Sequence, residues 1–169
     1  MGRSSLQDVA GLADPAQLWN FDLFFDRLPS GVSGNLRNLT FRVKTTEYPG
    51  AEVEGVEVEL HGVKLMYMGR ATYTHELSVT FLEGVDWETR NAFYQWRELG
   101  RSWTKNSGVD SSVYKTSATL TMYDDTPNEA KTVKLIGVWP KSIQAISLDN
   151  TQSAAVELSV TFSFDYTEE

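Results

Sequence analysis

The hexamer ELSVTF occurs twice in this chain, at residues 76–81 and again at residues 157–162. In both copies polar and apolar residues alternate, which is the period of a β-strand with two different faces. Leu, Val and Phe point to one face of such a strand, and Glu, Ser and Thr point to the other. Each hexamer therefore predicts a strand with one buried face and one polar, mildly acidic face of mostly short side chains.

The landmarks that precede each hexamer come in the same order. Val43-Lys44 and Tyr48-Pro49 precede the first copy, and Val133-Lys134 and Trp139-Pro140 precede the second. This order favours two similarly built halves that each donate a hairpin to one sheet. The alternative is that both copies only reflect the residues that strands prefer.

Alternation and breaker residues predict the remaining elements. Strands are expected in NFDLFF, in LTFRVKT (residues 39–45), in a hairpin that turns at residues 68–71, and in the segments SATLTMYD, TVKLIGVWP, SIQAISL and AAVELSVTFSFDY. One helix is expected in DWETRNAFYQWRELG, with Asp86 as its N-cap. Its apolar stripe is either helix-to-sheet core or partly an interface, and comprises Ala92, Phe93, Trp96, Leu99 and Trp103. These elements predict one mainly β domain over residues 19–169, after a mobile polar arm over residues 1–18.

The composition excludes several classes of function. The chain has no cysteine, which excludes disulfides, thiolate metal sites and cysteine nucleophiles. A formal net charge of −8 without a Lys/Arg cluster argues against tight binding to a nucleic-acid backbone. His61 and His75 stand outside any metal-ligand spacing, and no phosphate loop or nucleophile motif is present. No apolar run approaches the roughly 20 residues of a membrane-spanning helix. We therefore expect no catalytic, cofactor-binding or metal site, and no membrane insertion.

An ordered set of segments resembles the tail tube proteins of contractile bacteriophages. It is similar, more distantly, to the inner tube proteins of type VI secretion and other contractile injection systems. The segments are NFDLFF, TTEYPG, LTMYDD, GVWPKSI and SVTFSFDY. No single motif is specific, but the ordered set is, and it covers most of the chain from Trp19 onward. The polar arm and the loop after the helix depart from the pattern, so no family role is carried over to them.

The resemblance implies a small β-sandwich or barrel with one flanking helix, assembling as a hexameric ring with a continuous inner β-barrel. Stacked rings would form a hollow tube, a structural protein of the virion tail through which the genome passes on infection. The implied partners are other copies of the chain and the tail sheath, tape measure, baseplate hub and tail terminator proteins. DNA is implied only in transit, and assembly in the host bacterial cytoplasm. The alternative is the inner tube of a phage-like bacteriocin or of a type VI or extracellular contractile injection system. A ligand-binding β-sandwich module is a more remote alternative, and we expect no enzyme.

Two groups of residues follow as site predictions. The polar face of the hexamer strands is expected to line the lumen, through Glu76, Ser78, Thr80, Glu157, Ser159, Thr161, Ser163 and Asp165. These residues include three carboxylates and no Lys or Arg, so we expect an acidic lumen that does not hold DNA. The acidic run and the turn before it are implied to touch the adjacent ring, through Tyr48, Pro49, Gly50, Glu52, Glu54, Glu57 and Glu59. The alternative for the acidic run is a solvated strand face.

Overall fold

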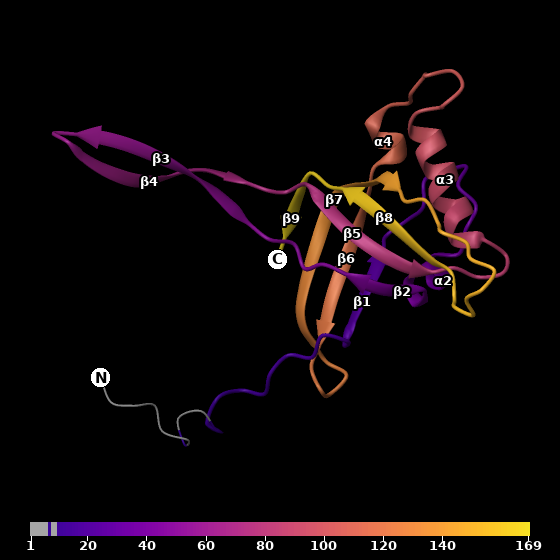
Figure 1. The fold of residues 1–169 in the computed structure, drawn as a ribbon, viewed down its shortest axis with the longest axis horizontal. Helices are drawn as coiled ribbons and strands as arrows, with labels where there is room; N and C mark the ends of the chain where they lie inside the picture. Colours follow the sequence, from indigo (N-terminus) through magenta and orange to yellow (C-terminus); the bar gives the residue numbers. More distant parts are fainter. Residues whose placement is uncertain (1–6, 8–9) are drawn as a thin grey trace.

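Antiparallel strands make up most of the regular structure of this chain (Figure 1), as the alternation predicts. The computed structural model describes residue 7 and residues 10–169, so part of the predicted arm 1–18 lies outside the described residues. The elements are β1 (Phe21–Phe25), α2 (Leu36–Phe41), β2 (Val43–Thr46), β3 (Glu52–Leu60), β4 (Val63–Thr72), β5 (Glu76–Leu82), α3 (Glu88–Gly100), α4 (Ser111–Tyr114), β6 (Thr116–Tyr123), β7 (Glu129–Ile143), β8 (Glu157–Ser163) and β9 (Tyr166–Glu168).

The main sheet folds over on itself through one long strand. Its strand order is β1-β6-β7-β8-β5-β2, with β9 beside β7. The first part of β7 pairs with β6 and β9, and the last part, from Trp139, pairs with β8. Between them Gly137 has a φ of 74°, and a Cβ there would lie 2.1 Å from the carboxylate of Asp165. Glycine is therefore required where β7 passes from one half of the sheet to the other.

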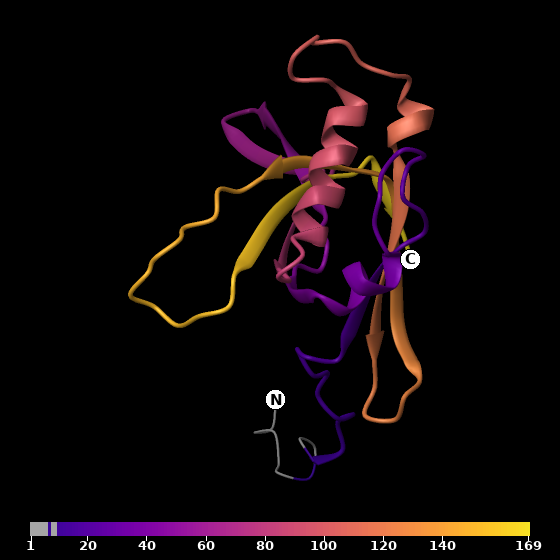
Figure 2. The same cartoon turned by 90° about the vertical axis from the view of Figure 1, so that its right-hand side faces the viewer.

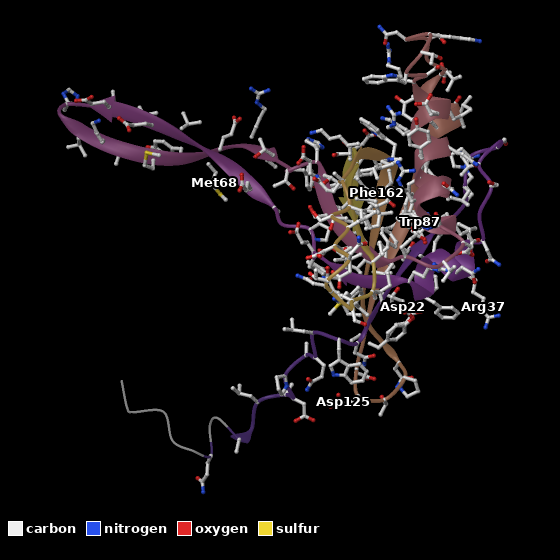
Figure 3. The ribbon with its side chains drawn as sticks, turned by 45° about the vertical axis from the view of Figure 1, so that its right-hand side comes forward. Asp22, Arg37, Met68, Trp87, Asp125 and Phe162 are labelled. Carbon is white, nitrogen blue, oxygen red and sulfur yellow. The ribbon has the colours of Figure 1, made fainter. Side chains whose placement is uncertain are left out.

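The core lies between the two halves of the sheet and helix α3. Phe25 of β1 packs on Phe162 of β8, with ring centroids 5.3 Å apart. The ring centroids of Phe93 in α3 and Phe81 in β5 are 4.9 Å apart, and Trp96 is 1% exposed. Figure 3 shows Phe162 inside this body of the molecule. The helix thus covers the apolar face of β5 and β8, which confirms the predicted flanking helix.

The apolar stripe of α3 is only partly core. Ala92, Phe93 and Trp96 are buried, and Leu99 is half-buried. Trp103 lies beyond the end of the helix and is 79% exposed. The core interpretation therefore holds for the first three positions and is wrong for Trp103.

Helix α3 begins one residue later than predicted. Trp87, not Asp86, is the N-cap residue, with a left-handed φ of 55° and no side-chain cap bond. Instead the carboxylate of Glu83 accepts hydrogen bonds from the backbone N–H groups of Thr89 and Arg90, at 3.3 and 2.8 Å. The first turn is thus capped by a residue outside the helix, which satisfies two of its free donors.

The segment LTFRVKT is not one strand. Its first residues belong to α2, and only the residues from Val43 form β2. Asn35 caps the helix by accepting a 3.0 Å hydrogen bond from the N–H of Arg37. The hydroxyl of Thr40 donates to the carbonyl of Leu36 at 3.1 Å, so this β-branched residue is held inside the helical turn. A local cap has overridden the strand preference of the segment.

Strands β3 and β4 form a two-stranded hairpin that projects far from the body (Figure 1). The hairpin turns at His61-Gly62 and not at residues 68–71, which lie inside β4. Both turn residues have positive φ, 51° and 78°, which is the backbone of a type I′ turn. Histidine is among the residues that tolerate this conformation, and glycine adopts it freely.

The final two predicted strands also differ in extent. Strand β7 ends at Ile143, so most of SIQAISL belongs to the long loop that projects beside β8 in Figure 2. The last segment breaks after Ser163, where the N–H of Asp165 donates to the carbonyl of Ile136 at 2.8 Å. The chain crosses there from β8 to β9, on the other half of the sheet.

Candidate functional site

The two copies of the hexamer pair with each other. Strands β5 and β8 are antiparallel neighbours, with Val79 opposite Val160 and Leu77 opposite Phe162. A local two-fold axis therefore passes between the two valines and relates one hexamer to the other. The flanking pairs are β2 with β5 and β7 with β8, so each half of the chain donates two neighbouring strands to one sheet. The β3–β4 hairpin is inserted between β2 and β5, so the first half is longer than the second between its Pro landmark and its hexamer.

The polar residues of both hexamers share the outward face of this ribbon. Glu76 lies opposite Ser163, Ser78 opposite Thr161, and Thr80 opposite Ser159, with the last two hydroxyls 3.2 Å apart. The residues of the face are exposed or half-buried, whereas the alternate residues are buried beneath α3. The predicted lumen residues on this face are Glu76, Ser78, Thr80, Glu157, Ser159, Thr161 and Ser163. We call them the polar face.

Asp165 does not belong to this ribbon. It lies beyond the end of β8, where both carboxylate oxygens accept hydrogen bonds from the Nζ of Lys115 at 2.8 Å. Phe164 is still buried, like the apolar residues of β8, and the alternation fails at Tyr166, which is exposed. By then the chain has passed to the other half of the sheet, where the N–H of Asp165 donates to the carbonyl of Ile136 and Tyr166 begins β9.

The polar face also carries basic residues, contrary to our expectation. Lys141 of β7 forms an ion pair with Glu76, and Lys44 of β2 forms one with Glu157. The prediction considered only the two hexamer strands, and the lysines come from the strands on either side. With Lys115 on Asp165, each of the three predicted carboxylates has a lysine partner. The face is therefore charge-balanced and not acidic.

The projecting hairpin has one apolar face that no other described residue buries. The register pairs Val56 with Tyr67 and Leu60 with Val63 on that face. These four side chains are 46 to 58% exposed. The opposite face carries Glu57 and Glu59 together with Lys64 and Met66, and Met68 stands on the hairpin clear of the body in Figure 3. Glu57 is paired with Lys64 at 2.8 Å. Sequence reasoning placed the acidic residues of β3 in a contact with the adjacent ring and gave the apolar residues that alternate with them no such role.

The root of the hairpin is tied to the end of the chain. The hydroxyl of Tyr48 donates to the carboxylate of Glu169 at 3.1 Å, and Lys131 pairs with the same carboxylate at 2.6 Å. Burial, followed by the hydrogen bond to Glu169 and its charge, raises the pKa of Tyr48 above its ordinary value. The hydrogen bonds from Lys131 and Tyr48 lower the pKa of Glu169. The predicted turn 48–50 is thus anchored to β7 and β9.

Among residue 7 and residues 10–169, no helix is long and apolar enough to cross a membrane. The same residues include no group of three His, Asp or Glu side chains that could hold a metal ion.

A helix thus covers one face of an antiparallel sheet, the other face is polar, and a hairpin leaves an apolar row exposed. The chain belongs to the phage tail tube protein family, whose model matches residues 23–168. Its role is therefore that of a structural tail tube protein. No curated protein sequence matches the chain significantly.

Solved structures share the fold over most of the chain. A chain of the sheath-tube complex of an extracellular contractile injection system, PVC, matches with a TM-score of 0.66 and 14% identity, covering 98% of this chain and 97% of that chain. A chain of the sheath/tube terminator of PVC matches with a TM-score of 0.68 and 13% identity, covering 94% and 98%. The SPP1 tail tube matches with a TM-score of 0.51 and 11% identity, covering 90% and 77%. At these identities the likeness shows the fold.

Proposed function

We propose that this chain closes into hexameric rings that stack into a hollow tail tube, with the polar face of β5 and β8 toward the lumen. One observation carries the orientation: the polar face is uncovered, while the opposite face is packed beneath α3. Turning the apolar face toward the lumen would expose Phe81 and Phe162 to water and separate them from Phe93. That exchange is unfavourable for each large apolar side chain.

The strand order supports closure into a continuous inner barrel. The strip β7-β8-β5-β2 ends on two edges. Within the described residues, β2 pairs only with β5, and the part of β7 from Trp139 onward pairs only with β8. Joining β2 of one copy to β7 of the next uses both edges and leaves none open. Such a contact is heterologous, so repeating it closes a ring.

The hairpin supports the stacking of rings. The apolar row of the hairpin stays exposed among residue 7 and residues 10–169, and a large exposed apolar patch is typical of an interaction surface. We propose that β3–β4, with the turn 48–50 at its root, contacts the adjacent ring. The apolar row supplies buried area there, and the residues predicted for this contact, including Glu52, Glu54, Glu57 and Glu59, lie on the same hairpin or at its root.

The partners follow from the tube. We propose that it contacts a tail sheath, a baseplate hub and a tail terminator, that a tape measure protein occupies the growing lumen, and that DNA passes through on infection. The matches to PVC chains also favour a second candidate, the inner tube of a contractile injection system, which uses the same ring and the same lumen.

A single cysteine tests the orientation, because the chain has no other. Ser78→Cys should react with a small maleimide both in dispersed subunits and in assembled tubes. A maleimide carried on a globular protein too large for the lumen should label the subunits but spare the tubes. Equal labelling of tubes by the large reagent would place Ser78 outside the lumen. Electron microscopy of the same preparation counts the subunits per ring.

A further inference from the structure

Two lysines on the strands that flank the hexamers occupy equivalent places. In β2 the register passes from Val43 to Thr45 across a bulge, so Lys44 has no partner of its own in β5. In β7 it passes from Pro140 to Ser142 across a bulge, so Lys141 has none in β8. A β-bulge re-aims the side chain of its extra residue. Both lysines are thus freed from the regular strand alternation.

Each lysine reaches across one strand to a glutamate two strands away. Lys44 of β2 crosses β5 to Glu157 of β8, and Lys141 of β7 crosses β8 to Glu76 of β5. The two glutamates are the first residues of the two hexamers. The local two-fold relation between Val79 and Val160 therefore exchanges the two ion pairs, which we call the cross-strand pairs.

Stability of the fold does not account for this duplication. All four side chains are between 44 and 50% exposed, and ion pairs at such sites contribute little to folding. The pairs do change what the polar face offers to a solute. Without the two carboxylates it would present two free ammonium groups per subunit among hydroxyls. Free ammonium groups bind nucleic-acid phosphates by releasing counterions.

We propose that the two glutamates act as positioning residues that hold the two lysines flat on the sheet and keep their charge from a passing nucleic acid. This inference rests on the proposed lumen, because only there does the polar face meet DNA in transit. The lysines keep the face from becoming acidic, and the glutamates keep it from binding nucleic-acid phosphates. The hydroxyls of Ser78, Thr80 and Thr161, which lie between the two ion pairs, carry no charge.

Dispersed subunits test the cross-strand pairs without reference to the lumen. The probe is a short double-stranded DNA, followed by fluorescence anisotropy in low salt, at subunit concentrations below those that form tubes. The double variant E76Q/E157Q should bind the DNA at least about tenfold more tightly than the unchanged chain. Its plot of log K against log salt concentration should be steeper by about 1 to 2, since each phosphate contact adds about 0.9.

The control variant D125N/E129Q also removes two negative charges, one from exposed Asp125 in the β6–β7 connection and one from exposed Glu129 at the start of β7. It releases no lysine on the polar face, so its binding should match that of the unchanged chain. Adding K44Q and K141Q to E76Q/E157Q should abolish the gain. If E76Q/E157Q binds no better than the control, the positioning role is wrong. Should the double variant fail to fold, E76Q and E157Q alone should each give about half of the added salt slope.

Assembled tubes then test the place of action. Tubes of E76Q/E157Q should retain the labelled DNA on gel filtration, whereas tubes of the unchanged chain and of the control should release it. A gain in dispersed subunits that disappears in tubes would overturn the lumen assignment and leave the ion-pair assignment intact. The absence of a gain in both preparations would overturn the positioning role and leave the lumen assignment untouched.

Discussion

Replacing Trp96 tests the packing that forces the polar face outward. Trp96 is 1% exposed, and its ring lies 6.0 Å from that of Phe25 and 6.3 Å from that of Phe162. Its Nε1–H donates a 2.6 Å hydrogen bond to the carbonyl of Tyr114, which joins α3 to α4. Trp96→Ala removes the ring contacts and the donor together. We expect it to lower the free energy of unfolding by about 3–5 kcal/mol, through the cavity that remains between helix and sheet.

A second variant separates the two contributions. Trp96→Phe keeps most of the apolar ring and loses the donor to Tyr114, so it should cost less than Trp96→Ala, about 1–3 kcal/mol. Trp103→Ala is the matched control, because that tryptophan is 79% exposed and outside the helix. Its effect on the subunit should stay within about 0.5 kcal/mol.

The assay is urea unfolding of dispersed subunits, followed by tryptophan fluorescence and far-UV circular dichroism. Each variant should shift the midpoint without changing the slope, which reports the surface exposed on unfolding. A cost below about 1 kcal/mol for Trp96→Ala would refute the reasoning, because α3 would then not be what covers the apolar face of β5 and β8. A change of slope would instead indicate that the denatured or native state had been altered.

Three further variants test other parts of the molecule. Replacing the hairpin, residues 52–72, by a short Gly/Ser linker should leave the sheet folded and prevent stacking, so long tubes in electron micrographs would contradict the stacking role. Ser78→Arg with Thr161→Arg should still allow tubes to form but slow DNA delivery, and unchanged delivery kinetics would count against a lumen that does not hold DNA. Glu83→Gln should lower the free energy of unfolding by about 2–4 kcal/mol in urea, because it weakens the cap of α3 and removes the buried carboxylate that lies 3.5 Å from the guanidinium of Arg42. Its control is Asp86→Asn, at an exposed carboxylate, which should cost less than about 0.5 kcal/mol.

Acid should loosen the root of the hairpin. The folded-state pKa of Glu169 is lowered, so the contacts it makes stabilise the folded chain above the ordinary carboxyl range and are lost as the pH falls through its folded pKa. Amide hydrogen exchange at residues 47–51 should therefore quicken at low pH, after correction for the intrinsic rate. Glu169→Gln should remove this extra acid dependence. If these amides show the same pH dependence of exchange in the unchanged chain and in Glu169→Gln, the carboxylate of Glu169 does not hold the root.

Local alternation predicted the parts of the fold that depend on neighbouring residues. The buried and exposed positions of both hexamers follow from period two alone, and the helix follows from the spacing of Ala92, Phe93 and Trp96. The turn at His61-Gly62 also has a local signal in the sequence, since a glycine after a residue that tolerates positive φ favours a type I′ hairpin.

Other features depend on contacts that no local pattern contains. The pairing of β5 with β8 joins residues about eighty positions apart. Alternation could therefore predict that both strands exist, but not that they are neighbours in the sheet. The bulges at Lys44 and Lys141 are properties of paired strands, and for that reason the charge of the polar face was mispredicted. The cap of α3 by Glu83 likewise needs the loop geometry that brings a carboxylate to the end of the helix.

Strand β7 has a mechanical consequence. It is 15 residues long, and its backbone runs without interruption from one half of the folded sheet to the other. A force that slides the two halves past each other is therefore carried by covalent bonds along β7, and not only by side chains packed between the layers. A tube that is driven through a barrier is loaded along its axis. Under such a load we expect the β3–β4 hairpin to deform first, because it is joined to the body at one end only. We expect β7, the strand that both halves share, to be the last part of the subunit to break its pairing.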